Sequence, residues 1–450
     1  MTLHEPTHQP VYLTGHLAPV TEETESHDLP VEGSLPPELN GRYFRNGPNP
    51  RPGQDPGHWF TGDGMLHGVR LQGGRALWQR NRWVRTTAFA GARFLGPEGP
   101  DLRAVTANTN VIRHADRILA LVENGLPYQV TDQLDTVGPY DFGGRLTTAM
   151  TAHPKEDPVT GDLHFFGYGA LPPYLTYHRA TADGTLVESR EIPVGGPTMM
   201  HDFAITENHV VWLDLPVVFD HARLGRGGMP YRWDDGYPAR IGVMAQHGTT
   251  AVRWFEVEPG YVYHVGNARE DAAGRIVLDA VRYGRDGFVR SWDRISGAAQ
   301  PGVPAPSESA DHPRLHQWTL DPRTGRVSEQ PLDDRAVEFP TVNETLVGRP
   351  SRYRYAVADT SIVKYDLTLG ANRSYDAGSG QAPGEAVFVP AADARAEDDG
   401  WLLTIVSDRS GRGSAFAVLD ASDMTRVATV PLPHRVPAGF HGNWLPDAES

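Results

Sequence analysis

Short β-type runs separated by turn residues constrain the fold of this chain more than any other feature of its sequence. Runs of three to six mostly apolar residues recur along the chain, and Gly, Pro, Asp or Asn lies close to each of them. Such runs predict strands joined by turns, and helical periodicity is hard to find. We therefore predict an all-β fold. The clearest runs are residues 111–113, 117–122, 163–166, 209–213, 275–278 and 401–406.

Three turn signals between these runs predict β-hairpins. Residues 157–162 and 321–326 share one form, with Asp-Pro at the start and Gly one residue before the end. Pro presets the backbone early in a tight turn, and Gly allows the left-handed conformation late in it. The Asp-Gly pair at residues 183–184 is a further two-residue hairpin signal.

Many short strands at regular spacing are typical of a sandwich, a barrel or a propeller. A chain of 450 residues is too long for one sandwich, whereas seven propeller blades would take about 64 residues each, against about 40–45 in a compact blade. The surplus is expected to form long loops that cap one face, including residues 216–242 and 297–313. No Pro/Ser-rich linker divides the chain. We predict a single β-propeller domain over residues 1–450, with an extended N-terminal segment of about 30 residues packed on it.

Charge and cysteine content exclude several classes of function. The chain has 56 acidic and 41 basic residues, a net charge of −15, which argues against a nucleic-acid partner. Cysteine is absent, which excludes thiolate nucleophiles, iron–sulfur clusters and zinc–thiolate sites, so nitrogen and oxygen would have to hold any transition metal. No apolar run approaches the roughly 18 residues of a membrane span. The N-terminus lacks the pattern of a signal peptide, which favours a cytoplasmic protein, and the preference for Arg over Lys indicates a GC-rich, bacterial genome.

Four of the 19 histidines stand out because each lies at the edge of a strand-like run with small or apolar neighbours. Neighbours in sequence among the four are 48 to 177 residues apart, so no pair can share a helix face. They would converge only if the chain returned repeatedly to one axis, as a propeller makes it do. Imidazole suits Zn, Cu, Fe and Ni. The four are His153 in TAHPK, His201 in MMHDF, His264 in VYHVGNA and His441 in GFHGNW.

Three glutamates in equally apolar settings are candidate partners for these histidines. A carboxylate among apolar neighbours is costly unless it is paired or hydrogen-bonded. Behind an all-nitrogen ligand set, such groups would fix the imidazole orientation and offset the charge of the metal. Each could instead pair with an Arg. The three are Glu123 in LVENG, Glu338 in VEFPTVN and Glu385 in PGEAVFVP.

Taken in order, the motifs of this chain resemble those of the carotenoid cleavage oxygenase family, non-haem iron enzymes that split double bonds of polyenes and stilbenes. The resemblance covers nearly the whole length. Single motifs are weak, but their joint order along the chain is specific. They are GRYFRNGPNP at 41–50, GDGMLHG at 62–68, NTNV at 108–111 with Glu123 after it, TAHP at 151–154, MHDF at 200–203, YH at 263–264, EFP at 338–340, GE at 384–385 and FHG at 440–442.

The resemblance implies a seven-bladed propeller with Fe(II) on its axis. The metal ligands it implies are His153, His201, His264 and His441, with Glu123, Glu338 and Glu385 behind them. His67 and His434 are interpreted as structural. With O₂, the enzyme would cleave a carbon–carbon double bond of a carotenoid or apocarotenoid into two carbonyl products, with no catalytic residue beyond the metal centre. No reducing-cofactor motif is visible in the sequence.

An apolar polyene needs an apolar tunnel, and aromatic residues are candidates for its wall. Stilbene-cleaving relatives tend to carry Lys directly before the first glutamate, where this chain has Val122, which cannot donate a hydrogen bond. This favours a polyene over a stilbene. The resemblance also suggests an apolar mouth in peripheral contact with a membrane, formed by residues 171–175 and 215–219; no protein partner is predicted. The candidate substrate contacts are Phe339, Phe60, Phe166, Trp444 and Val122.

Other functions stay open at this point. A stilbene-cleaving dioxygenase of the same family is the nearest alternative. A metal-dependent hydrolase or lactonase propeller would more naturally use Asp, Glu and Asn oxygens around Ca²⁺. A non-catalytic binding propeller would not need four histidines with apolar flanks. The isomerase branch of the family works in animal membranes, which the bacterial-looking composition disfavours.

Overall fold

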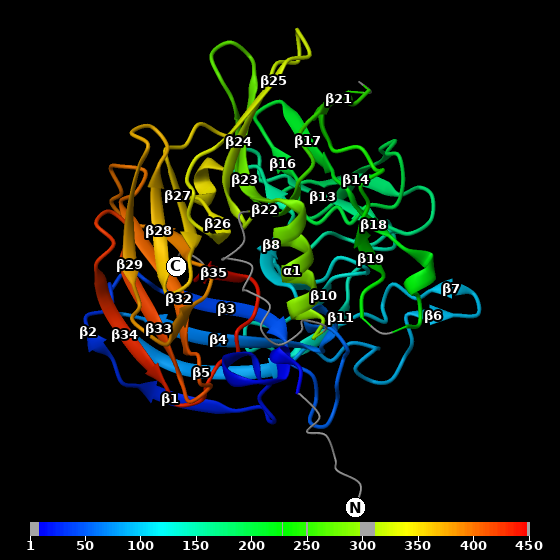
Figure 1. Ribbon diagram of the computed structural model, residues 1–450. Helices are drawn as coiled ribbons and strands as arrows, with labels where there is room; N and C mark the ends of the chain where they lie inside the picture. Colours follow the sequence, from blue (N-terminus) through cyan, green and yellow to red (C-terminus); the bar gives the residue numbers. More distant parts are fainter. Residues whose placement is uncertain (1–8, 227, 249–250, 298–310, 448–450) are drawn as a thin grey trace, which may run out of the picture.

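Seven antiparallel sheets surround a common axis in the computed structural model, which describes residues 9–226, 228–248, 251–297 and 311–447. Figure 1 shows these sheets as the blades of a β-propeller, which confirms the predicted fold class.

Four consecutive segments form blades of four strands each. In strand order these blades are β12 (Lys155–Glu156), β13 (Leu163–Tyr168), β14 (Leu175–Ala180) and β15 (Leu186–Glu191); β16 (Ala204–Ile205), β17 (His209–Asp214), β20 (Arg240–Ala245) and β21 (Arg253–Glu256); β22 (Tyr261–Glu270), β23 (Ile276–Tyr283), β24 (Arg314–Leu320) and β25 (Val327–Pro331); and β26 (Glu338–Thr341), β27 (Tyr353–Val357), β28 (Ser361–Asp366) and β29 (Ala371–Asp376).

The remaining three blades complete the ring, and two of them combine strands from both ends of the chain. The C-terminal strand β35 pairs with β3, while the N-terminal strands β1 and β2 lie at the outer edges of two neighbouring sheets. The single-domain division over residues 1–450 stays a prediction. These blades are β8 (Asn110–His114), β9 (Arg117–Leu121), β10 (Tyr128–Val130) and β11 (Thr136–Pro139); β35 (Gly442–Pro446), β3 (Gly41–Pro48), β4 (Gly64–Gln72), β5 (Arg75–Trp83) and β1 (Glu25–Leu29); and β30 (Gln381–Pro383) with β31 (Val387–Pro390), β32 (Gly400–Asp408), β33 (Ser414–Asp420), β34 (Arg426–Leu432) and β2 (Glu32–Gly33).

The predicted strands and turns are found where the sequence indicated them. The two Asp-Pro turns close β12–β13 and β24–β25, and in each the first Asp accepts a hydrogen bond from the N–H of Gly161 or Gly325. Both glycines have a positive φ, +71° and +78°, which is the reason that Gly occupies this position. Every one of the six predicted runs contributes a blade strand.

Apolar side chains fill the spaces between adjacent blades, because both faces of an inner blade are covered by its neighbours. Phe165 packs in one such cluster and Phe166 in the next, as expected for successive residues of a strand. One buried ion pair joins two blades: Arg354 on β27 holds Asp279 on β23 at 2.7 and 2.9 Å, and both side chains are 1% exposed.

The cap over one face contains regular elements that the sequence did not predict. Residues 216–242 form the hairpin β18 (Val217–Phe219) and β19 (Tyr231–Trp233) and the start of β20, rather than one long loop. An α-helix, α1 (Arg285–Ile295), crosses the front of the ring in Figure 1. Phe288 and Trp292 of α1 and partly buried Phe60 pack in the same cluster as β18. Of the predicted loop 297–313, residues 298–310 lie outside the described residues.

Short elements complete the described chain. A second small hairpin lies at the edge of the molecule, and five 3₁₀ turns occur in loops. These are β6 (Leu95–Gly96) with β7 (Gly99–Pro100), η1 (Val11–Leu13), η2 (Gly15–Leu17), η3 (Trp59–Thr61), η4 (His221–Arg223) and η6 (Glu344–Leu346). No helix in the described ranges is long and apolar enough to cross a membrane.

Candidate metal centre

The four histidines predicted from sequence all lie at or near the innermost strands. His153 and His201 precede β12 and β16 by two and three residues, His264 lies within β22, and His441 directly precedes β35. Each innermost strand faces the axis of the ring, so histidines from four different blades meet there. The propeller is thus the reason that residues as far apart as His153 and His441 become neighbours.

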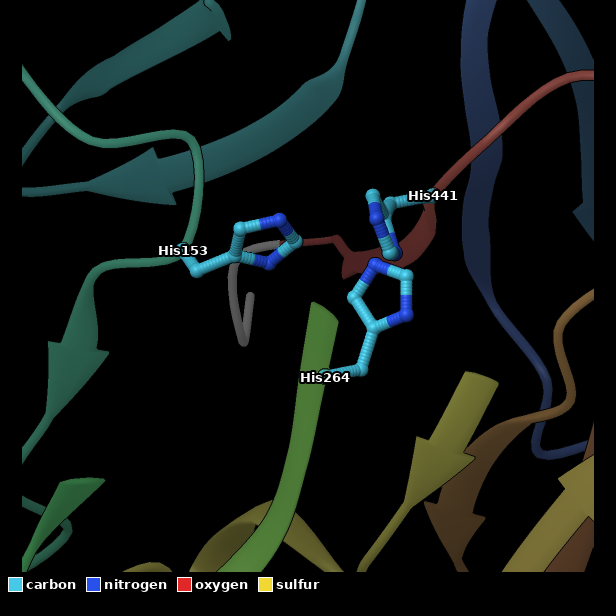
Figure 2. A group of neighbouring side chains, drawn as sticks. All are labelled: His153, His264 and His441. Atoms are coloured by element: carbon cyan, nitrogen blue, oxygen red, sulfur yellow. The ribbon is translucent and has the colours of Figure 1, made fainter. Parts of the chain in front are cut away.

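The rings of His153 and His264 each contact the other three rings, and all four rings are nearly buried. The ring centroid of His153 lies 4.5 Å from that of His201, 5.2 Å from that of His264 and 4.6 Å from that of His441. Figure 2 shows the side chains of His153, His264 and His441 gathered around one point. Potential ligand nitrogens of these three residues all lie within 4.8 Å of one another. His201 lies outside that group of three, but its Nε2 is 3.0 Å from the Nε2 of His153.

A glutamate stands behind three of the four rings. The Nδ1 of His201 lies 2.6 Å from Glu123. The Nδ1 atoms of His264 and His441 lie 2.6 Å from Glu338 and 2.8 Å from Glu385. A carboxylate accepts a hydrogen bond from Nδ1–H, which leaves the lone pair of Nε2 free for a metal. The candidate pairs are therefore His201–Glu123, His264–Glu338 and His441–Glu385.

Further donors hold these carboxylates in place, and sequence reasoning missed two of them. The Tyr168 hydroxyl donates to Glu123, and the Tyr283 hydroxyl donates to Glu338 at 2.8 Å. Glu385 instead accepts from the backbone N–H of Gly442 at 2.8 Å. Both tyrosines end blade strands, β13 and β23, and nothing in their local sequence marks them as different from other buried tyrosines.

Burial and charge set the protonation of the rings. Burial lowers the pKa of His153 well below its ordinary value, and the neighbouring imidazoles lower it further. Burial also lowers the pKa of His264 despite its glutamate. For His201, burial acts in the same direction, but the nearby carboxylates, Glu123 foremost among them, together outweigh it and raise the pKa. Two of the rings are therefore held neutral, the form in which imidazole binds metals.

The arrangement fits a transition-metal ion. Two nitrogens bound to one ion at right angles, with metal–nitrogen bonds of about 2.1 Å, lie about 3.0 Å apart. The Nε2 atoms of His153 and His201 have this separation. Imidazole donors suit Fe, Zn, Cu or Ni, and the three glutamates offset the charge of a dication without taking coordination positions.

Phe339 and Phe60 lie nearest to the histidines among the predicted substrate contacts. The Phe339 ring stacks on His264, with centroids 5.0 Å apart, and meets His441 edge-on at 5.4 Å. Its φ is +52°, a strained value for a residue with a side chain, and such strain is common at functional sites. Phe60 packs edge-on against Tyr263, which in turn meets His201.

The other three candidates have different surroundings. Phe166 packs on Phe203 and Trp212 in a blade core. Val122 is 7% exposed and belongs to a separate apolar cluster. Trp444 lies in the wall of an axial cavity, which is described below. Of the two predicted apolar mouth segments, residues 215–218 are buried in the core, whereas Leu171 is 67% exposed.

The two histidines interpreted as structural lie outside the group of four. His67 lies within β4 and is 5% exposed. His434 shares a hydrogen bond of 3.0 Å with Ser26, which links the last blade to β1.

A seven-bladed propeller with clustered axial histidines and carboxylates behind them defines a class of non-haem metal enzymes. The profile of the family described as retinal pigment epithelial membrane protein matches residues 17–446. The "Carotenoid cleavage oxygenase" of Mycobacterium tuberculosis is 41% identical over 500 residues, covering 97% of each chain. This chain therefore belongs to the carotenoid cleavage oxygenase family, oxidoreductases that incorporate O₂.

Other relatives extend the comparison to plants and to solved structures. The "Carotenoid 9,10(9',10')-cleavage dioxygenase 1" of Arabidopsis thaliana is 35% identical over 497 residues, which cover 97% of this chain and 90% of the relative. The lignostilbene dioxygenase structure of Pseudomonas brassicacearum has a TM-score of 0.87 and 30% identity, covering 98% and 100% of the two chains. A cobalt-substituted Synechocystis ACO has a TM-score of 0.82 and 28% identity, covering 95% and 97%. The structural matches agree with the propeller described above.

Proposed function

We propose that this enzyme binds Fe(II) and uses O₂ to cleave one carbon–carbon double bond of a carotenoid or apocarotenoid. In the net reaction the C=C and O=O bonds break and two C=O bonds form, so no external reductant is needed. The observation that carries the proposal is the convergence of four imidazoles with carboxylates behind three of them.

The proposed ligands are His153, His201, His264 and His441. A bound Fe(II) would supply O₂ activation, which no side chain of the twenty amino acids provides. The chain supplies the rest: Glu123, Glu338 and Glu385 hold the imidazole tautomers and offset positive charge. A hydrolytic, calcium-type site is disfavoured, because nitrogen donors rather than oxygen donors meet here.

Aromatic rings next to the histidines favour an apolar substrate. Phe339 stacks on one candidate ligand, and Phe60 and Phe440 pack edge-on 5.3 Å apart in the cap. Such rings exclude water and offer apolar contact to a conjugated chain. We restrict the proposed substrate contacts to Phe339 and Phe60, because Phe166 and Val122 pack in blade cores.

A stilbene is the second candidate substrate. It is favoured by the lignostilbene dioxygenase among the similar structures, whereas the Mycobacterium and Arabidopsis relatives are named for carotenoid cleavage.

The test is anaerobic reconstitution with Fe(II), followed by ¹⁸O₂ and a panel of carotenoids, apocarotenoids and stilbenes. Labelled carbonyl products that need both iron and O₂ are the expected result, with faster turnover of a polyene. Cleavage without iron, or activity restored by Ca²⁺, would overturn the proposed chemistry. Faster cleavage of a stilbene would reverse the substrate assignment and leave the reaction type intact.

We also propose peripheral contact with a lipid surface through the loop between β13 and β14. Leu171 lies there and is 67% exposed. Since β12 and β13 are antiparallel and His153 precedes β12, this loop lies at the same end of the blade as the histidines. Co-sedimentation with neutral vesicles should decrease in Leu171→Glu and stay unchanged in the control Leu369→Glu, another exposed leucine in the β28–β29 turn.

A further inference from the structure

An axial cavity of about 660 Å³ reaches three of the four histidines. The innermost strands of all seven blades, β8, β12, β16, β22, β26, β31 and β35, form its wall. His153, His264 and His441 line it deep in the ring. Pro158 and Ala182, both exposed, line it where the β12–β13 and β14–β15 turns reach the surface. The cavity therefore connects the candidate metal centre with the face opposite the cap.

The cap side offers a hydrated cation a poor way in. Phe60 packs edge-on against Tyr263, Phe440 and Trp292, with centroid distances of 6.2, 5.3 and 6.1 Å. Tyr263 in turn packs against His201 at 5.4 Å. A dication that sheds its water against such rings gains no oxygen ligand in exchange, which makes the passage costly.

The axial cavity, in contrast, carries carboxylates from its mouth to the histidines. The Glu156 side chain is half exposed, and Glu385 contacts His441. Glu344 lines the same cavity and interacts electrostatically with both. Glu344 is exposed toward the cavity, and desolvation inside the ring together with these two carboxylates raises its pKa to about 7, against a smaller opposing effect of Lys155. A charge at this position is repelled by its neighbours and is relieved by a cation.

The positive charges in the wall do not cancel this series. Lys155 is bound at 2.7 Å to Asp202, which is 2% exposed, and its attraction for Glu344 is the smallest of the effects on that carboxyl group. Arg113 donates to the Pro446 carbonyl at 2.7 Å, at an exposed position. Within the described residues, no ion pair to Glu344 is found.

We propose that the axial cavity is the route by which a divalent metal ion reaches the four histidines, and that Glu344 is the carboxylate that the ion meets on the way. This inference rests on the proposed metal centre. A residue on the route lowers the barrier for passage in both directions, so its loss slows uptake and release alike. A residue of the final site would change the release rate and the affinity instead.

The experiment follows Co(II) uptake by the metal-free full-length protein through the visible absorption of the bound ion. Electrostatic guidance changes rates by about 10-fold to 1,000-fold when a whole charged cleft is involved, so one carboxylate is expected to account for about threefold or more. Glu344→Gln should slow uptake, and release to a chelator, by similar factors. Glu98→Gln is the matched control, because Glu98 is an exposed carboxylate between β6 and β7.

A second variant tests the cavity without touching charge. Ala182→Trp places a large ring at the mouth, on an exposed turn where folding is not at risk, and should slow both rates while leaving the affinity unchanged. Unchanged rates in both variants, or faster release with slower uptake in Glu344→Gln, would overturn the inference. If the unaltered protein binds no Co(II) at all, the metal centre itself fails, which is a different result from normal binding with unaffected rates.

Discussion

Replacing Glu385 by Gln is expected to weaken metal binding more than the same change at Glu338. The two oxygens of Glu385 each receive an N–H donor: His441 Nδ1 lies 2.8 Å from Oε1, and the Gly442 N–H lies 2.8 Å from Oε2. An amide has only one acceptor oxygen, so a Gln must turn its NH₂ group toward one of these two donors. As long as His441 keeps its proton on Nδ1, the form that metal binding needs, one buried hydrogen bond is lost in either orientation.

Glu338 has a different set of partners. Its Oε2 receives both N–H donors, from His264 Nδ1 and from the Phe339 backbone, each at 2.6 Å. Its Oε1 accepts from the Tyr283 hydroxyl at 2.8 Å. A Gln carbonyl can keep the place of Oε2, and the hydroxyl can rotate to accept from the NH₂ group, because a tyrosine oxygen both donates and accepts. Every partner stays satisfied.

The difference between the two variants follows from the cost of an unsatisfied buried donor, about 1–3 kcal/mol. In the metal-free Glu385→Gln variant, the new amide can relax by donating to His441 Nδ1, which moves the proton of this ring to Nε2. Metal binding must reverse that step, and about 1–3 kcal/mol corresponds to about 5-fold to 150-fold in affinity. Loss of the negative charge, common to both variants, costs about 10-fold to 100-fold. We expect Glu385→Gln to bind Co(II) at least about fivefold more weakly than Glu338→Gln.

The assay is a Co(II) titration against a competing chelator, with the thermal midpoint of each metal-free variant as the check on folding. Glu98→Gln, far from any histidine of the centre in sequence, controls for the change in net charge. Equal losses at Glu338 and Glu385, or a larger loss at Glu338, would refute the hydrogen-bond argument.

Three other changes test the rest of the structure. His264→Ala should abolish stoichiometric iron and turnover, and elemental analysis that still finds one iron per chain would contradict the ligand assignment. Burial lowers the pKa of His67 to about 3. Below pH 6.5 this histidine is therefore protonated in the unfolded chain but stays neutral in the folded chain, so the free energy of unfolding falls by up to about 1.4 kcal/mol per pH unit as the pH decreases. Thermal midpoints between pH 7 and 5 should therefore fall less steeply in His67→Gln, and parallel curves would rule this out. Asp279→Ala should destabilise by about 3–5 kcal/mol, and adding Arg354→Met should recover part of that loss in denaturant unfolding.

Local patterns in the sequence predicted the blades because strand signals are short-range. The run at 117–122 became β9, and the Asp-Pro turns closed the hairpins with Gly161 and Gly325 at positive φ. The helix α1 was missed because it is short and contains Gly287, a poor helix former. Its Phe288 and Trp292 are four residues apart, a helical spacing that was present but too brief to stand out.

The candidate ligands could be predicted from the sequence because a histidine with small or apolar neighbours beside a strand is unusual. The direction in which a side chain points was harder to predict. Val122 was expected to face the substrate together with Glu123. Successive residues of an extended chain point to opposite sides, so the residue beside Glu123 packs in the blade core. Phe166 packs in a blade core for a related reason: it lies on β13, the second strand of its blade, where neighbouring blades cover both faces.

The pairing of β35 with β3 closes the ring of blades and at the same time brings the last candidate ligand, His441, to the axis. His441 directly precedes the C-terminal strand β35, which pairs with β3, and its carbonyl accepts from the Asn46 N–H at 2.9 Å. The other three histidines, His153, His201 and His264, belong to blades whose strands do not pair with β35. A metal ion bound by all four would therefore tie the C-terminal strand to the blades across the axis. Because such an ion binds the closed ring and not the unfolded chain, its binding energy stabilises closure. Any change that loosens β35 from β3 should then lower metal affinity, even with every ligand in place.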